Sequence, residues 1–320
     1  SYNTRSAIDN KPKIEPGTIY ILLDYKEWYP LVKPIYDIES KVSQSGVKYE
    51  NYIFRNWERT EYCNDLNSSK VYFISHGMMN YHTEGWIKEM GVALANKNDG
   101  IVLCVDWGWW SSKLIPNNSA AGIDPAVDRT HEALNVAFNN NPKVNVNLSR
   151  FHLIGHSHGA HLCGRLTKKY GRAKRITALD ASEELSHTTG SRTQWNAQYI
   201  DYYKSSITCG TEYLVGDDNF ILIQKDEGFQ NTTFNQLGGY LGGLWVDIIR
   251  HGYACSWFTN TIDNNTEIGF NWDLYRKEYK SILNHQGWDG VINGSAGVIE
   301  GLSNYKTHKT WNYTFPWYIY

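Results

Sequence analysis

The sequence predicts an α/β fold with a mostly parallel central sheet and helices on both faces. Short apolar runs bounded by turn residues recur along the chain, as expected for strands that are buried on both faces. From residue 124 onward, segments with helical periodicity separate these runs. This alternation of strand and helix favours parallel pairing, because parallel strands need long crossover connections, which are usually helices.

The individual elements follow from their residue types. Pro125 suits the first position of a helix, and Gly171 suits the position after a helix end. In the helix that Pro125 opens, four side chains share one face: Val127, His131, Leu134 and Phe138. In chain order, the predicted elements are strands at 18–24, 71–75 and 101–105, a helix from Asp124 to about Asn139, a strand at 151–154, a helix from about Ser157 to Tyr170, and a strand at 176–179.

Composition narrows the class of protein. A chain of 320 residues with 41% hydrophobic and 20% charged residues predicts a globular protein. The net charge of −2 gives no reason to expect nucleic acid or an anionic surface as partner. No apolar run reaches the ~18 residues that a transmembrane helix needs. Without repeats or an interdomain linker, residues 1–320 are expected to form a single domain.

Glycosylation sequons indicate the compartment better than the cysteines do. The chain opens Ser-Tyr-Asn-Thr without an initiator Met, so we expect a mature, secreted form whose signal peptide has been removed. The five cysteines allow at most two internal disulfides, and buried thiols are the alternative for Cys104 and Cys163. The sequons favour a secreted glycoprotein and lie at Asn67, Asn117, Asn147, Asn231, Asn264, Asn293 and Asn312.

A nucleophile motif lies where a predicted strand meets a predicted helix. Residues 155–159 read Gly-His-Ser-His-Gly, which fits Gly-x-Ser-x-Gly. The nucleophile of such a motif occupies a sharp, strained turn that lifts its hydroxyl clear of the sheet. The glycines let neighbouring backbone approach, and the following helix points N–H groups at the site. This context indicates Ser157 as a nucleophile, with a plain structural turn as the alternative.

A serine hydroxyl needs a general base, which in turn needs an orienting acid. In α/β enzymes with this motif the chain order is Ser, acid, His. Asp180 ends the next strand, so its carboxylate is expected at the same sheet edge as Ser157, with a helix or turn cap as the alternative. His251, at the start of another predicted helix, is the favoured base. By position alone, the competing histidines are His187, His285 and His308.

The nucleophile and acid segments resemble those of the pancreatic lipase family, which includes vespid venom phospholipases A1. Residues 155–161, Gly-His-Ser-His-Gly-Ala-His, look like the family's Gly-His-Ser-Leu-Gly-Ala-His. Residues 176–180, Ile-Thr-Ala-Leu-Asp, resemble its Ile-Thr-Gly-Leu-Asp, whose Asp is the triad acid. The resemblance implies an α/β-hydrolase fold, no cofactor, and a secreted ester hydrolase acting on lipid or at a lipid–water interface.

Other segments extend the resemblance over roughly residues 18–316. Residues 76–78, His-Gly-Met, resemble the family's His-Gly-aromatic oxyanion loop, and residues 105–107 resemble its Val-Asp-Trp. Residues 251–262 are similar to the stretch that begins with the catalytic His, and residues 309–316 echo its closing strand. The resemblance therefore favours His251 as the base.

The same resemblance implies an oxyanion hole. Its donors would be the backbone N–H groups of Met78 and His158, which would stabilise negative charge on the carbonyl oxygen of the substrate. Each such donor typically contributes about 2.7–4 kcal/mol to lowering the barrier.

The chain departs from the family pattern in loops that shape substrate access. His158 stands where the family has Leu, and Ala181-Ser182 stand where it has Pro-Ala. No cysteine lies just before His251, and the family's Gly-His-x-Asp-Phe-Tyr-Pro block is not recognisable in residues 205–235. These departures concern the identity of the substrate more than the chemistry.

Two further features allow alternative interpretations. His156, His158 and His161 have the composition of a metal site, but they straddle a sharp turn, so their side chains should diverge and no metal is expected. The Gly-rich apolar segment 237–246 fits either a mobile lid or a bend that packs inside. The sequence is neutral between these two roles.

A non-catalytic protein is the main alternative function. Insect yolk proteins resemble lipases but lack the nucleophile, and an aromatic content of 14% would suit such a storage or binding role. All three triad positions are filled with reactive residues here, which favours the hydrolase. A toxin acting by lipid hydrolysis would share its mechanism. The sequence leaves open the choice between triglyceride, phospholipid and other esters, and also the oligomeric state.

Overall fold

The computed structural model describes a large part of the chain. The residues it describes are 17–24, 26–46, 48–66, 68, 70–111, 122–182, 195–206, 209–211, 218–221, 223–224, 251–259, 262, 296–298 and 305–306.

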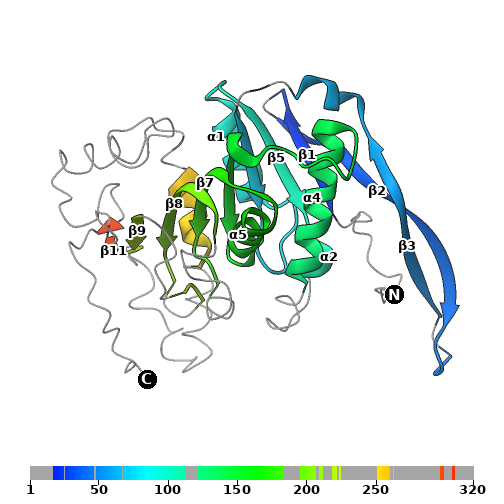
Figure 1. The fold of residues 1–320 in the computed structure, drawn as a ribbon. Coiled ribbons are helices and arrows are strands. Elements are labelled where there is room, and N and C mark those ends of the chain that lie inside the picture. Colours follow the sequence, from blue (N-terminus) through cyan, green and yellow to red (C-terminus); the bar gives the residue numbers. More distant parts are fainter. Residues whose placement is uncertain are drawn as a thin grey trace.

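A ten-stranded sheet forms the centre of the molecule (Figure 1). Its strand order is β11-β9-β8-β7-β6-β4-β5-β1-β2-β3. From β5 to β11 every neighbouring pair is parallel, whereas β1, β2 and β3 are joined by antiparallel pairing. The strands are β1 (Thr18–Leu23), β2 (Glu27–Val42), β3 (Lys48–Arg59), β4 (Val71–Ser75), β5 (Ile101–Asp106), β6 (Phe151–His156), β7 (Ala173–Leu179), β8 (Ala197–Lys204), β9 (Asp218–Ile221) and β11 (Ala296–Val298). β10 (Ile223–Gln224) and β12 (Tyr305–Lys306) form a separate pair.

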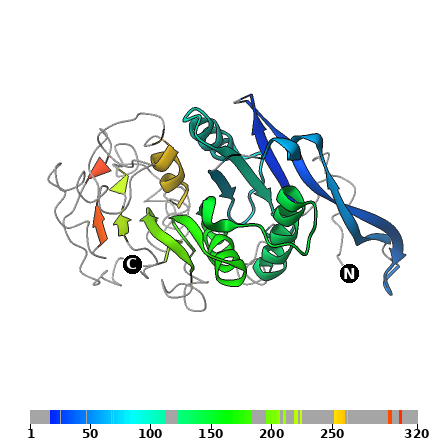
Figure 2. The same ribbon diagram turned by 45° about the horizontal axis from the view of Figure 1, so that its top comes forward.

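Helices cover both faces of the sheet (Figure 2). α4 (Ile123–Asn139) and α5 (His158–Tyr170) pack on one face. α1 (Gly85–Ala95) and the helical residues 251–259 pack on the other. The remaining helices are short: η1 (Glu61–Asp65), α2 (Gly108–Ser111) and η2 (Leu148–Arg150). The predicted α/β-hydrolase architecture is confirmed.

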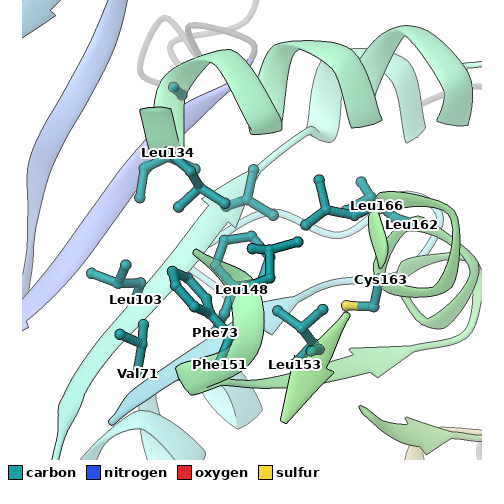
Figure 3. Close-up of a cluster of buried hydrophobic side chains, with 14 of the residues drawn as sticks. Val71, Phe73, Leu103, Leu134, Leu148, Phe151, Leu153, Leu162, Cys163 and Leu166 are labelled. Atoms are coloured by element: carbon teal, nitrogen blue, oxygen red, sulfur yellow. The ribbon is translucent and has the colours of Figure 1, made fainter. Parts of the chain in front are cut away.

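Each face of the sheet has its own apolar core. Alternate residues of a strand point to opposite faces, so Phe151 and Leu153 of β6 contact the α4/α5 core, and Ile154 contacts the α1 core. Figure 3 shows the first core, where Leu162 and Leu166 of α5 lie over the strands. Each fully buried side chain of this kind stabilises the fold by roughly 1.5–3 kcal/mol. This two-sided burial explains the continuous apolar runs of the strands.

The predicted strands and helices occur close to their expected bounds, with one local correction. α4 begins at Ile123 with Gly122 as its N-cap, so Pro125 is the third helical residue and not the first. Pro125 is still tolerated there, because the N–H groups of the first helical turn have no partner within the helix. Residues 251–259 are helical, as expected for the segment that begins at His251.

A long antiparallel hairpin is the largest feature that the sequence did not predict. β2 and β3 pair from Val32 and Arg59 out to Val42 and Lys48, and β3 is the edge strand of the sheet. Figure 1 shows the hairpin as an arm whose outer end extends away from the helices, whereas Leu31 and Val32 at its base pack in the α4/α5 core. Ile35 is 43% exposed, so the arm leaves apolar side chains in contact with water.

All five cysteines lie in the described ranges, and Cys63, Cys104, Cys163 and Cys255 are buried free thiols. Burial raises the pKa of the Cys104 and Cys163 thiols, so the interpretation of both as buried thiols is confirmed. Among the described helices, none is both long and apolar enough to cross a membrane.

Candidate active site

Ser157 occupies a strained turn between β6 and α5. Its φ of 55° and ψ of −125° form a backbone conformation that residues other than glycine rarely adopt. The turn is tight: a Cβ on Gly155 would lie 2.4 Å from the carbonyl oxygen of Gly159, and one on Gly159 would lie 2.4 Å from that of His76. Both flanking glycines are therefore required by the close approach of backbone, as the motif predicts.

Asp180 lies beside Ser157 at the carboxyl ends of neighbouring strands. The backbone N–H of Ser157 donates to the carbonyl of Leu179 at 2.9 Å, and that of Asp180 donates to Tyr203 at 2.7 Å. Asp180 follows β7 directly, with φ 45°, and its side chain is fully buried. The sheet therefore places the predicted nucleophile next to the residue before the predicted acid.

The Asp180 carboxylate is held by several donors from the end of β8. The backbone N–H of Ser205 donates to Oδ1 at 2.8 Å, and that of Ser206 donates to Oδ2 at 3.2 Å. The hydroxyl of Ser206 also donates to Oδ2. Sequence reasoning missed these donors. Two of the three are backbone N–H groups, which every residue except proline carries, so the residue types do not reveal them.

His251 joins the site from a distant part of the chain. Its Nδ1 lies 2.6 Å from Oδ2 of Asp180, and its side chain is 17% exposed. Burial would raise the pKa of Asp180, but the hydrogen bond and positive charge of His251, with Lys204 and Ser206, hold it below its usual value. An ionised carboxylate keeps the His251 proton on Nδ1, which leaves Nε2 able to accept a proton.

His156 fixes the backbone of His251. Its Nε2 lies 3.0 Å from the carbonyl oxygen of His251, and the two ring centroids are 4.6 Å apart. Since a carbonyl can only accept, the proton of the His156 ring is on Nε2. Burial and the neighbouring charge of His251 lower the pKa of His156 to about 3, so this ring stays neutral near pH 7.

The loop after β4 contacts Ser157. A Cβ on Gly77 would lie 2.9 Å from the Cβ of Ser157, so this position also requires glycine. The ring of His76 orders the loop: Nδ1 donates to the carbonyl of Gly77 at 3.0 Å, and Nε2 accepts the Trp107 N–H at 3.1 Å. Met78 follows half-buried, and His158 is the first residue of α5.

Asp106 connects both ends of this loop to β5. Its Oδ2 lies 2.5 Å from Nδ1 of His82, and its Oδ1 lies 3.8 Å from Nε2 of His76. Oδ1 also accepts the Gly108 N–H at 2.9 Å. Burial would raise the pKa of Asp106, but the imidazoles of His76 and His82 hold it well below its usual range. The Val-Asp-Trp segment at 105–107 thus supports the loop through both Asp106 and Trp107.

Two of the three histidines near Ser157, His156 and His161, bind different carbonyl groups. His156 bonds the carbonyl of His251, whereas Nε2 of His161 lies 3.0 Å from the carbonyl of Ser182. No group of three side chains suited to hold a metal ion occurs within the described ranges. His187, His285 and His308, the segment 237–246 and the segment 309–316 lie outside the described residues.

A protein-family model described as Lipase matches residues 45–204, half of the chain. Over 211 residues the chain is 28% identical to a phospholipase A1 of Vespa velutina, covering 62% of this chain and 66% of that one. It is 27% identical to pancreatic triacylglycerol lipase of Mus musculus over 236 residues, covering 66% and 49%. It is 28% identical to the human inactive pancreatic lipase-related protein 1 over 135 residues, covering 42% and 28%. In each case the match spans less than two thirds of the relative.

Proposed function

Because the chain belongs to the lipase family, we propose that it is a serine hydrolase that cleaves ester bonds of lipids. Ser157 is the proposed nucleophile, His251 the base and Asp180 the acid. The single observation that carries the proposal is the 2.6 Å contact between His251 Nδ1 and Asp180 Oδ2, beside a serine in a strained turn.

The proposed reaction proceeds through an acyl-enzyme. Nε2 of His251 takes the proton of Ser157 as Oγ attacks the ester carbonyl, and Asp180 stabilises the imidazolium that forms. His251 then gives the proton to the leaving alcohol, and a water activated by the same imidazole hydrolyses the acyl-enzyme. The backbone N–H groups of Met78 and His158 donate to the oxyanion. Two observations support this assignment. Met78 directly follows Gly77, whose backbone lies against Ser157, and His158 directly follows Ser157 as the first residue of α5.

The proposed substrates are glycerolipids that carry carboxylic esters. The relatives named phospholipase A1 and triacylglycerol lipase both cleave acyl esters, so the proposed scissile bond is an acyl ester. A screen of phosphatidylcholine against triolein, each in mixed micelles, separates the two classes.

We also propose that the protein is secreted and N-glycosylated. Asn147 is exposed, and its side chain accepts the Ser149 N–H at 3.0 Å in the turn that opens η2. An exposed Asn in a turn is accessible to the transferase that reads Asn-x-Ser.

The test of the proposed activity is covalent labelling with a fluorophosphonate probe, followed by peptide mass spectrometry. We expect the label on Ser157 and its loss in Ser157→Ala and His251→Ala. Ser45→Ala changes an exposed serine in the turn between β2 and β3, serves as a matched control, and should label like the wild type. A folded wild-type protein that takes no label would overturn the proposed activity and favour a non-catalytic storage or binding role.

A further inference from the structure

A buried lysine lies at the end of the strand beside the proposed acid. Lys204 is the last residue of β8, and its side chain is 1% exposed. Its Nζ donates to the carbonyl oxygen of Gly210 and, at 3.3 Å, to that of Thr211. Burying an ammonium group costs much solvation free energy, so a lysine is rarely buried unless its charge is used or paired. The position of this charge therefore needs an explanation.

The backbone that Lys204 binds is the backbone that encloses Asp180. A Cβ on Gly210 would lie 2.2 Å from Oδ1 of Asp180, so Gly210 is in close contact with the carboxylate. The Gly210 N–H donates to Oγ of Ser206 at 2.6 Å, and that hydroxyl donates to Oδ2 of Asp180. The Thr211 N–H donates to the carbonyl of Ala181 at 2.7 Å. Residues 210–211 thus lie between the ammonium and the carboxylate.

Few charged or titratable groups face Asp180 from the described elements around it. The imidazole of His251 and the thiol of Cys255 approach from the helical residues 251–259, and the neutral ring of His156 approaches from β6. From β8 the charge of Lys204 acts on Asp180 and favours its ionised form. Lys204 is thus the fixed positive charge near this carboxylate, since the charge on His251 appears and disappears during the reaction.

We propose that Lys204 is a positioning residue for the triad, which pins residues 210–211 against Asp180 and holds the carboxylate ionised while His251 takes and releases its proton. This role rests on the proposed function. A neutral side chain at this position would leave the Gly210 carbonyl without its ammonium donor and would remove a charge that opposes protonation of the His251–Asp180 pair.

The test measures the rate of fluorophosphonate labelling of Ser157 as a function of pH, in Lys204→Met and Lys204→Gln. The Met variant removes the charge and the donor, whereas the Gln variant removes the charge but keeps an N–H donor on a side chain one bond shorter. In both, we expect the acidic limb of the profile to move to higher pH by about half a unit or more, because the pair protonates more easily. The plateau rate should fall several-fold in Lys204→Met and less in Lys204→Gln.

Lys174→Met is the matched control, because Lys174 is an exposed lysine on β7, the strand that leads to Asp180. It should leave the profile unchanged. Circular dichroism and thermal unfolding identify any variant that fails to fold, and Lys204→Gln, the milder change, then decides the question. Folded Lys204 variants with an unmoved acidic limb would overturn the role of Lys204 but leave the proposed function standing. Absence of label in the wild type at every pH would overturn both.

Discussion

The Nε2 atom of His156 lies 3.0 Å from the carbonyl oxygen of His251, so the residue before the proposed nucleophile is bonded to the backbone of the proposed base. This contact spans 95 positions of the sequence and fixes where the helix at 251–259 begins relative to β6. The base is thereby positioned through its own main chain as well as through Asp180.

Replacing His156 should weaken catalysis without weakening substrate binding. We expect His156→Phe to lower kcat about tenfold, since a hydrogen bond of this kind is worth about 0.5–1.5 kcal/mol. KM should change little. His156→Gln, whose amide can donate to the same carbonyl, should recover part of the loss. Equal activity in the Phe and Gln variants would argue against the hydrogen bond as the cause.

Gly77→Ala tests the approach of the loop after β4 to Ser157. The added Cβ would lie 2.9 Å from the Cβ of Ser157, so either the loop or the nucleophile must shift. We expect the labelling rate of Ser157 to fall by about 10- to 100-fold, because small displacements of an aligned site are costly. Gly85→Ala is the control, since a Cβ there meets nothing within 4 Å. A variant at Gly77 with wild-type labelling would show that the loop does not constrain the site.

Asp106→Asn tests whether the charge of Asp106, which holds the same loop, stabilises the fold in a pH-dependent way. The folded-state pKa of Asp106 lies below its unfolded value of about 3.9, so its charge stabilises the fold above that pH. As the pH falls from about 4 towards the folded-state pKa, this contribution is lost. We expect Asp106→Asn to lower the free energy of unfolding by about 1–3 kcal/mol at pH 7.

The difference between wild type and Asp106→Asn should shrink in urea unfolding at pH 3. Asp124→Asn is the control, because Asp124 makes an exposed ion pair with Arg165, worth about 0–1 kcal/mol. A difference at Asp106 that stays constant from pH 7 to pH 3 would contradict the role assigned to its charge.

The proposed glycosylation is tested by two variants of one sequon. In a secretory host, Ser149→Ala removes the acceptor signal at Asn147 but leaves the Asn147 side chain free to accept the residue 149 N–H. We expect the intact mass to fall by one glycan and the melting temperature to change little. Asn147→Gln should lose the same glycan and also destabilise the turn by about 0.5–1 kcal/mol. Identical masses before and after glycosidase treatment would refute glycosylation of the protein.

Local patterns were enough to predict the architecture and the surroundings of Ser157. The strands at 71–75 and 101–105 are buried on both faces and, apart from Ser75, apolar along their length, which is a strong signal. The sequence reveals the tight turn through Gly155 and Gly159, because a side chain at either position would clash with neighbouring backbone. Asp180 follows from chain order, but His251 needed the family resemblance, since nothing local separates it from other downstream histidines.

Other parts of the site could not be predicted because their signals are weak or run against general expectation. Lysine is mostly exposed in proteins, so no pattern suggests that Lys204 is buried. The arm formed by β2 and β3 escaped prediction because Pro30 and Pro34 interrupt β2, and proline usually argues against an inner strand. Its pairing depends on contacts across the turn at 43–46, which no single segment reveals.

The amides of Ser157 and Asp180 continue the hydrogen-bond ladder of the sheet one step beyond its strands. Amides held in this way exchange with solvent on the time scale of global unfolding, and not of local fluctuation. We therefore expect the amides of the proposed nucleophile and acid to be among the slowest to exchange in the described part of the chain. A change in the proposed ester specificity is therefore expected to come from the connections at the strand ends, because the sheet ladder itself holds Ser157 and Asp180 in place.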